Sequence, residues 1–280
     1  MFFFSTFGLV LFMSCKKNNE DENGGNGKTT MTTTSSKVCL VFSDDMESIT
    51  INWGDGTKDE LYLLYREFFL NHEYPSAGVH TITIIGAIKV LVCGGNQLTT
   101  LDVSKNTVLK ELDCGGNQLT TLDVSKNTVL KILGCYVNPL TTLDVSKNTA
   151  LTYLDCEGNQ LTILDVSKNM TLNWLYCPGN QLKTLDVSKN TALNRLGCGK
   201  NQLTTLDVSK NTALKSLDCS RNNFSASALN TLFGTLHSNT IPYKCIYIGD
   251  NPGTDGCDIS IAENKGWEVT KGAKFKKINQ

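Results

Sequence analysis

The chain has 280 residues, enough for one elongated domain or two compact ones. Its 26 Lys and Arg residues nearly balance 27 Asp and Glu residues, so the chain has no global positive field, which argues against a nucleic-acid-binding protein, where a clustered positive face is expected. Only three histidines occur, His72, His80 and His237, which restricts metal binding and acid–base chemistry that depend on imidazole.

The N-terminus reads as an export signal. Residues 1–14 are too short an apolar stretch to span a bilayer but fit the apolar core of a secretory signal peptide. The usual positively charged start is missing, which leaves the true start codon open. Ser14 directly before Cys15 resembles a bacterial lipoprotein cleavage site, which implies that Cys15 becomes the first mature residue and carries a lipid. The alternative is an ordinary signal peptide with an incidental cysteine.

Residues 15–36 are predicted to be the lipidated cysteine and a disordered tether. This stretch has almost no apolar side chains and much Asn, Gly, Thr and Ser, so it cannot bury enough surface to fold. Its acidic run Glu20–Glu22 resembles the export tags of surface lipoproteins in Bacteroides-like bacteria. We therefore expect a protein that is lipid-anchored to the outer membrane and exposed at the cell surface.

Residues 37–87 are predicted to form a small β-rich domain that caps the rest of the chain. Val38–Phe42 and Ser48–Trp53 have strand composition, and a Gly-Asp-Gly-Thr turn comes next. The W-G-D-G-T element, His72-x-Tyr74 and a G-x-H-T-I-T-I strand together resemble the β-sandwich of polycystic-kidney-disease domains. The intervening E-L-Y-L-L-Y-R-E-F-F-L departs from that pattern, so we expect a reduced sandwich-like cap in which the turn is structural.

The chain repeats itself every 21 residues from residue 88 to 222. Units aligned on one leucine begin at residues 91, 112, 133, 154, 175, 196 and 217, and each junction reads L-x-x-L-x-C-x-x-N-x-L. This motif resembles the leucine-rich repeat, and the short unit is similar to internalin-type and other bacterial surface members. The resemblance implies a solenoid, because no single unit can bury its own leucines. We expect parallel strands on the concave face and short turns or extended segments on the convex face.

The same 21-residue period repeats several polar residues at fixed positions, and each such set forms a column along the solenoid. The asparagine columns Asn96–Asn222 and Asn106–Asn211 are predicted to satisfy backbone groups at tight turns. The aspartate column Asp102–Asp207 runs beside the lysine column Lys105–Lys210. An acidic ladder for calcium is one interpretation. Mutual neutralisation of exposed charges, with the aspartates helping to cap turns, is the other, and the equal numbers of the two charges favour it.

Eleven cysteines occur, and seven share one inward position: Cys93, Cys114, Cys135, Cys156, Cys177, Cys198 and Cys219. Side chains on neighbouring strands lie about 4.8 Å apart, farther than the Cβ separation of about 3.8 Å in a disulfide. We therefore predict buried free thiols that act as small apolar side chains. Cys245 and Cys257 are a candidate disulfide with either redox state open, and Cys39 is expected to be buried.

Residues 223–280 are predicted to form a β–α–β cap at the other end. Ser225 can cap the N-terminus of a helix from Ala226 to Leu236, whose apolar residues share one face. The remaining elements are expected at Ile246–Ile248 (strand), Asp258–Lys265 (short helix) and Trp267–Val269 (strand).

The outward concave positions differ most between otherwise near-identical units. Aromatic side chains gather in the middle units and charged side chains surround them: Tyr136, Tyr153, Trp174, Tyr176, Glu111, Asp155, Glu157 and Arg195. Tyr, Trp and Arg are enriched at binding hot spots, and exposed rings on a solenoid have no role in its core. We predict that these residues bind a protein segment or a glycan. The alternative is drift after recent duplication.

No catalytic motif for acyl transfer, zinc proteolysis, phosphate binding or dinucleotide binding is present. Asp155 and Glu157 are the one conceivable carboxylate pair, and we expect both in the open, without the burial that raises an acid's pKa. We therefore expect a non-enzymatic, monomeric binding protein without cofactor or metal. Its partner would be a host or bacterial surface protein or a glycan, not nucleic acid, and it would meet the membrane only through its lipid. The alternatives are a structural or adhesive scaffold and an accessory protein for polysaccharide capture.

Overall fold

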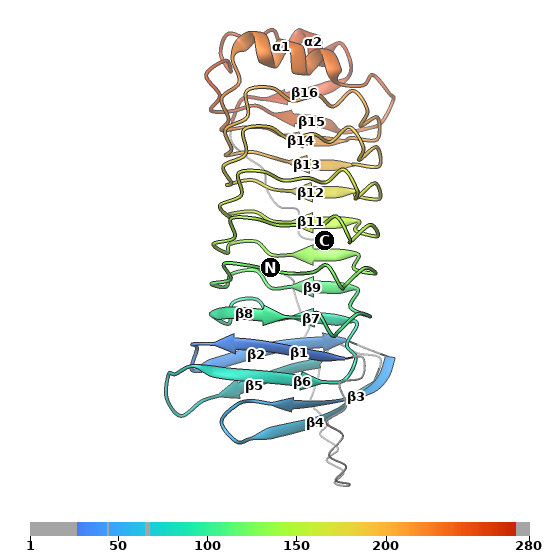
Figure 1. Ribbon diagram of the computed structural model, residues 1–280. Coiled ribbons are helices and arrows are strands. Elements are labelled where there is room, and N and C mark those ends of the chain that lie inside the picture. The colour runs from blue at the N-terminus through green and yellow to red at the C-terminus, as the bar shows by residue number, and fades with distance from the viewer. Residues whose placement is uncertain (1–26, 44, 65–67, 273–280) are drawn as a thin grey trace.

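The computed structural model describes residues 27–43, 45–64 and 68–272. These residues form an elongated stack of strands, with a β-domain at one end and helices at the other (Figure 1). The predicted signal peptide, Cys15 and the first part of the predicted tether lie outside the described residues. None of the helices among the described residues has the length and apolar composition of a membrane-spanning segment.

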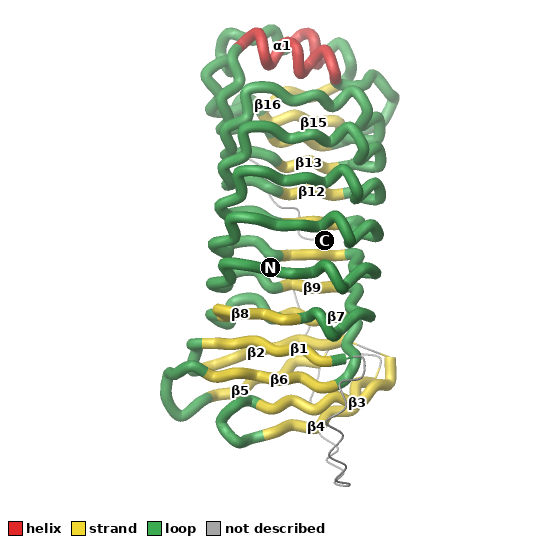
Figure 2. Tube along the Cα trace, in the orientation of Figure 1, coloured by secondary structure: helices red, strands yellow, loops and turns green. Residues whose placement is uncertain are grey.

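One three-residue strand per repeat unit builds a parallel sheet. The strands are β7 (Val90–Val92), β9 (Glu111–Asp113), β10 (Ile132–Gly134), β11 (Tyr153–Asp155), β12 (Trp174–Tyr176), β13 (Arg195–Gly197) and β14 (Ser216–Asp218). Equivalent leucines lie side by side and fully buried, so that Leu133 of β10 pairs with Leu112 and Leu154. Between β9 and β14 the return segments are turns and extended chain without a helix (Figure 2). The predicted solenoid is confirmed.

The N-terminal strands form two sheets that continue into the two walls of the solenoid. They are β1 (Lys28–Thr33), β2 (Lys37–Ser43), β3 (Asp45–Asn52), β4 (Lys58–Leu64), β5 (Phe68–Glu73), β6 (His80–Ile85) and, in the first return segment, β8 (Leu98–Asp102). In one sheet β2 pairs antiparallel with β7, while in the other, ordered β4-β3-β6-β1-β8, β1 pairs antiparallel with β8. The β-domain therefore caps the open edge of both walls by strand pairing.

Strand β1 corrects the extent of the predicted tether, because Lys28–Thr33 belongs to the folded β-domain. Thr29, Met31 and Thr33 point inward and are at most 1 % exposed, while the residues between them face outward. Composition alone misses this strand because Met31 is its one strongly apolar side chain. The threonines that complete its buried face are β-branched and favour strands.

The W-G-D-G-T turn is held by ring stacking and hydrogen bonds. The Trp53 ring is buried and stacks on His72 with 4.3 Å between ring centroids, and the Tyr74 hydroxyl donates to the Trp53 carbonyl at 2.8 Å. Asp55 accepts hydrogen bonds from the hydroxyl and N–H of Thr57, and His72 Nε2 lies 2.8 Å from its other oxygen. These bonds hold the pKa of Asp55 below its usual range, because they stabilise the carboxylate. The polar groups of this turn thus serve its structure.

The C-terminal residues form α1 (Ala226–Thr235), β15 (Lys244–Tyr247), α2 (Ser260–Glu263) and β16 (Trp267–Thr270). Strands β15 and β16 extend the parallel sheet beyond β14. The Ser225 hydroxyl accepts from the Ala228 N–H and caps α1, as expected. At the other end of α1, Lys265 Nζ donates to the carbonyls of Phe233 at 3.1 Å and Leu236 at 2.8 Å. The cap therefore covers the last repeat with helices, of which α1 is hydrogen-bonded at both ends.

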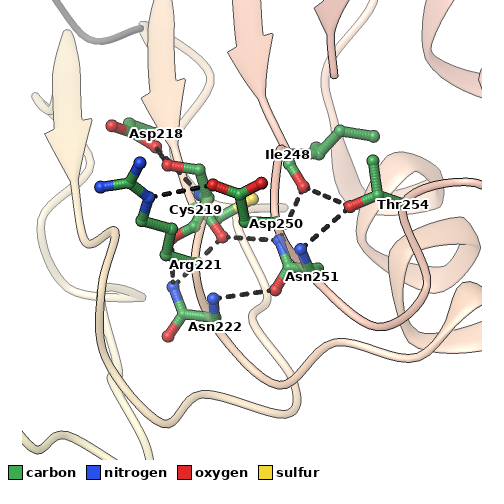
Figure 3. A network of polar contacts seen from close by, with 9 residues as sticks. Asp218, Cys219, Arg221, Asn222, Ile248, Asp250, Asn251 and Thr254 are labelled. Atoms are coloured by element: carbon green, nitrogen blue, oxygen red, sulfur yellow. Dashed lines mark hydrogen bonds and ion pairs between the residues drawn. The ribbon is translucent and has the colours of Figure 1, made fainter. Parts of the chain in front are cut away.

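In the first asparagine column, both the Oδ1 and the Nδ2 of the side-chain amide form hydrogen bonds. Asn159 Oδ1 accepts from the Leu140 N–H at 3.2 Å, and its Nδ2 donates to the carbonyls of Cys135 and Cys156, both at 3.0 Å. The column continues into the C-terminal cap (Figure 3), where Asn251 accepts from the Asn222 N–H at 3.0 Å. Each amide thus joins consecutive units at a buried turn.

From Asn127 to Asn211, the members of the second asparagine column form hydrogen bonds through Nδ2 only, whereas its first member, Asn106, also accepts the Ile88 N–H at Oδ1. Nδ2 of Asn169 donates to the carbonyls of Val145 and Asn148, both at 2.9 Å. Its Oδ1 is buried and has no hydrogen-bond partner among the described residues. The same holds for Asn127, Asn148, Asn190 and Asn211. The two columns, which look alike in the sequence, therefore differ in how completely their polar atoms are satisfied.

The seven repeat cysteines are buried free thiols, as predicted, and burial raises their pKa. The prediction for Cys39 is wrong. Its side chain is exposed, because strand β2 alternates and Val38 and Leu40 take the inward positions.

The candidate disulfide between Cys245 and Cys257 does not form, and both residues are free thiols. Cys245 Sγ lies 3.4 Å from the hydroxyl of Ser216, its neighbour on the adjacent strand. Cys257 Sγ instead donates to the Thr254 carbonyl at 3.3 Å, in the segment before α2. Cys245 lies on β15 and Cys257 in the segment before α2, so the two thiols contact different neighbours. Their separation along the chain does not reveal this difference.

Candidate functional site

The side chains on either side of each buried strand leucine project from the solvent side of the parallel sheet. We call this surface the sheet face, and it is the face that the sequence predicts as concave. Strand register places Tyr153 beside Trp174 and Trp174 beside Arg195 in one row, and Asp155 beside Tyr176 in the next. The middle of the sheet face therefore collects most of the predicted binding residues.

Three aromatic rings form a cluster on β11 and β12, which we call the ring cluster: Tyr153, Trp174 and Tyr176. Their ring centroids lie 5.9 Å apart for Tyr153 and Trp174, 6.1 Å for Tyr153 and Tyr176, and 6.4 Å for Trp174 and Tyr176. The Arg195 guanidinium carbon lies 4.6 Å from the Trp174 ring centroid, which is a cation–π distance. Tyr153, Trp174 and Arg195 are half-buried, whereas Tyr176 is buried. Four of the eight predicted residues thus come together.

Tyr136 follows β10 in the chain, and its side chain lies against residues of β9 and the segment after it rather than in the ring cluster. Its hydroxyl is 3.4 Å from Asp113 Oδ2. Its ring fills the space above Gly115, where an added Cβ would lie 2.3 Å from the Tyr136 ring carbon Cζ. Glycine at that position is what allows the ring to lie against the sheet. Asp113 is absent from the predicted site, although it occupies the same outward position as Asp155.

The expectation that Asp155 lies in the open is wrong, because its side chain is only 1 % exposed. Its Oδ1 accepts the Glu157 N–H at 3.1 Å, and its Oδ2 lies 3.4 Å from the Tyr153 hydroxyl. Asp113 and Asp218 accept backbone N–H groups in the same way. At this repeat position an aspartate therefore ends the strand with a side-chain cap, which composition does not reveal.

The tyrosine hydroxyls around these carboxylates remain protonated at neutral pH. Burial, and then the charges of Asp113 and Asp155, raise the pKa of Tyr136 to about 12. Burial and the neighbouring Asp155 carboxylate likewise raise the pKa of Tyr153. Both hydroxyls can therefore donate hydrogen bonds.

The two glutamates of the predicted site lie at the margin of the ring cluster. Glu111 is on β9, which β10 separates from β11. Glu157 lies just after the end of β11. Both side chains are exposed, so they add negative charge to the sheet face without joining the rings.

A neighbouring column changes together with the ring cluster, and inspection of the outward positions alone misses it. Two residues before the strand leucine, four units carry a lysine: Lys89, Lys110, Lys131 and Lys215. The three consecutive units with Tyr153, Trp174 and Arg195 instead carry a neutral polar residue: Thr152, Asn173 and Asn194. Comparison of the units at every position, rather than only at outward ones, would have found this change.

On the opposite wall the aspartate column caps turns. Oδ1 of each aspartate from Asp102 to Asp207 accepts the N–H of the serine two residues later, at 2.7 to 2.8 Å. These bonds, aided by the lysine three residues on, hold the pKa of Asp102, Asp123, Asp144, Asp165 and Asp186 below the usual range. The described residues contain no group of three or more His, Cys, Asp and Glu side chains suited to a metal ion. Turn capping therefore accounts for the column.

No family model matches the sequence, and no curated protein matches it. Solved structures do match. The functional domain of InlJ from Listeria monocytogenes, described as including a cysteine ladder, is 33% identical, covers 64% of this chain and 49% of its own, and has a TM-score of 0.47. A leucine-rich-repeat protein from Leptospira interrogans is 22% identical, with 63% and 53% covered and a TM-score of 0.51. An internalin (inlF) from Listeria monocytogenes is 24% identical, with 66% and 60% covered and a TM-score of 0.49.

The chain thus spans between 49% and 60% of the length of these structures. Likeness at the level of the Leptospira protein concerns the fold. It agrees with the 21-residue period and with the in-register leucines of the parallel sheet. By its fold, this chain is a leucine-rich-repeat solenoid protein.

Proposed function

We propose that the protein is a binding module that recognises a polypeptide or glycan partner through the sheet face at β11 to β13. The ring cluster carries this proposal. Each of these strands already buries its central leucine in the core, so the half-exposed Tyr153 and Trp174 are not needed to fill it. Large rings beside an arginine are the residues that dominate binding energies at protein surfaces.

The neighbouring column differs in the same units as the ring cluster. Here three consecutive units exchange lysine for Thr152, Asn173 and Asn194, and the same units carry Tyr153, Trp174 and Arg195. The exchange places neutral hydrogen-bonding groups beside the rings, which suits a surface that makes specific contacts.

The experiment is a binding screen of the protein against arrays of glycans and of host and bacterial surface proteins, repeated with the Tyr153→Ala/Trp174→Ala variant. Each ring is expected to contribute as a hot spot, so the variant should lose about thirtyfold or more in affinity for the true partner. Ile163→Ala is the control, because Ile163 is 77% exposed on a return segment and its loss should leave binding unchanged. Binding that survives the double substitution would move the site elsewhere. A folded protein that binds nothing would favour the adhesive-scaffold alternative.

We further propose that the chain is exported and anchored by a lipid on Cys15, with its solenoid at the outer surface of the cell. The Ser14-Cys15 pair and the polar residues after it support this proposal. Expressed in a Gram-negative host with an alkyne fatty acid, the protein is expected to incorporate the label and to partition into detergent. Cys15→Ser should abolish both, because the thiol is the acylation site. Undiminished label in Cys15→Ser would rule out this anchor.

A further inference from the structure

Arg195 is a half-buried arginine without a carboxylate partner. Its guanidinium carbon lies 4.6 Å from the Trp174 ring centroid, and within the part of the chain that the structure describes it forms neither a hydrogen bond nor an ion pair. The carboxylates of the next row hold other donors, since Asp155 and Asp218 each accept the backbone N–H two residues later. The N–H groups at the edge of the Arg195 guanidinium are therefore left for solvent or for a ligand.

Stacking prepares this guanidinium for an acceptor. Arg221 shows the ordinary alternative, because it is exposed and its Nε lies 3.0 Å from Asp250 Oδ2. Arg195 is instead held by the face of the Trp174 ring, which leaves the donors of its planar edge pointing away from the ring. A side chain that is already held loses less conformational entropy when it binds, so Arg195 is preorganised to bind an anionic group.

The charges along the same row also favour an anion at Arg195. Lys215, which directly precedes β14, is exposed and adds a second positive charge at this end. The row contains two carboxylates, Glu111 and Glu268, four and three strands from β13, which is about 19 and 14 Å. Exposed charges at such distances are largely screened at physiological salt. The aspartates of the next row restrict an anion to the side of the strands on which Lys215 lies.

An apolar strip leads up to Arg195. Ile132 is 36% exposed and lies in register beside Tyr153, which lies beside Trp174, which lies beside Arg195. An aliphatic side chain next to two rings suits the apolar side chains of a polypeptide. A sugar could stack on the rings but would gain little from Ile132, because most of its carbon atoms carry hydroxyl groups. The row therefore favours a polypeptide over a glycan.

We propose that the row from Ile132 to Arg195 binds an extended polypeptide segment through its apolar side chains and one aspartate or glutamate, whose carboxylate accepts hydrogen bonds from Arg195. This inference rests on the proposed function and names the chemistry of the partner. Ile132 and Arg195 are three strand spacings apart, about 14 Å, and four residues of extended chain cover about 13 Å. Residues i, i+2 and i+4 of such a chain share one face. The matching pattern is therefore apolar-x-apolar-x-acidic.

The probe is a library of random 12-residue peptides displayed on phage and selected on the full chain. Selected peptides are expected to share the apolar-x-apolar-x-acidic pattern. By calorimetry, a selected peptide should bind at least tenfold more tightly than its twin with Asn or Gln for the acidic residue, because a charge-assisted hydrogen bond is lost. In Arg195→Gln the two peptides should bind within about twofold of each other. The variant should fold, because the same position in the next unit holds the neutral Ser216.

Arg221→Gln is the matched control, because Arg221 already has Asp250 as its partner and lies outside the row. It should leave the tenfold preference unchanged. Selected peptides without a carboxylate, twins of equal affinity, or equal effects of Arg195→Gln and Arg221→Gln would each overturn the inference. A peptide or glycan that needs Tyr153 and Trp174 but not Arg195 would overturn it and leave the proposed function standing. If no ligand depends on Tyr153 and Trp174, the proposed function itself fails.

Discussion

Replacing Asn159 by alanine is expected to lower the free energy of unfolding by about 3 kcal/mol, because a buried N–H loses its acceptor. That acceptor is Asn159 Oδ1, which bonds the Leu140 N–H at 3.2 Å. The substitution also leaves a cavity at a buried turn, while the carbonyls of Cys135 and Cys156 each lose one donor and keep another, the Nδ2 of Asn138 and of Asn180. The effect is large because the Leu140 N–H is left in the interior, where water cannot replace its lost acceptor.

The matched substitution is Asn169→Ala in the second column, which is expected to cost about 1 kcal/mol. The carbonyls that Asn169 bonds keep other donors, since Asn148 N–H bonds Val145 and Leu151 N–H bonds Asn148. Deleting the side chain also removes a buried Oδ1 that has no partner among the described residues. Urea unfolding followed by circular dichroism measures both variants. Equal losses would show that the hydrogen bonds of the two columns do not determine their contribution to stability.

Gly253→Ala is expected to destabilise the C-terminal cap by about 3 kcal/mol, because the new methyl group would overlap backbone atoms. A Cβ at Gly253 would lie 2.1 Å from Ala226 N and 2.2 Å from the Ser225 carbonyl carbon. These atoms begin α1 and cannot rotate away as a side chain could. Gly253 also donates its N–H to the Phe224 carbonyl at 2.8 Å, so it cannot retreat without breaking that bond.

Gly234→Ala is the control, because Gly234 lies within α1, the helix whose first residues Gly253 contacts. A Cβ at Gly234 would meet nothing within 4 Å, and alanine should stabilise α1 by about 0.5 to 1 kcal/mol, because it is the better helix former. Hydrogen exchange of the α1 amides should therefore speed up in Gly253→Ala and slow down in Gly234→Ala, with the amides of β9 to β12 unchanged. Normal protection of α1 in Gly253→Ala would mean that the Ser225–Ala226 backbone can move aside at little cost.

The local pattern of the sequence was sufficient to predict the solenoid. A 21-residue period with leucine and cysteine alternating around one outward residue predicts stacked short strands, buried thiols and the outward rows that hold Tyr153 and Trp174. The helix after Ser225 is also predicted by local signals, a capping hydroxyl and apolar residues on one face. These features depend on residues close in sequence or repeated at one spacing, so the sequence alone predicts them.

The same local reasoning fails where a segment is stabilised by a distant one. Lys28–Thr33 has the composition of a tether, yet it forms a strand because β6 and β8 flank it. Cys39 resembles the buried cysteines, yet the register of β2 against β5 and β7 turns it outward. Neither outcome can be read from the residues themselves, because the strands that pair with them are distant in the chain.

Periodicity along the chain is enough to predict the repeat, the inward leucines and thiols, and the outward positions that vary between units. The burial of Asp155, the contact of Asp113 with Tyr136 and the different bonding of the two asparagine columns follow from the three-dimensional arrangement of the units. The physical reason is the range of the interactions. Periodicity and alternation are properties of the chain. Burial, side-chain pairing and hydrogen-bond satisfaction depend on which units stand next to each other in space.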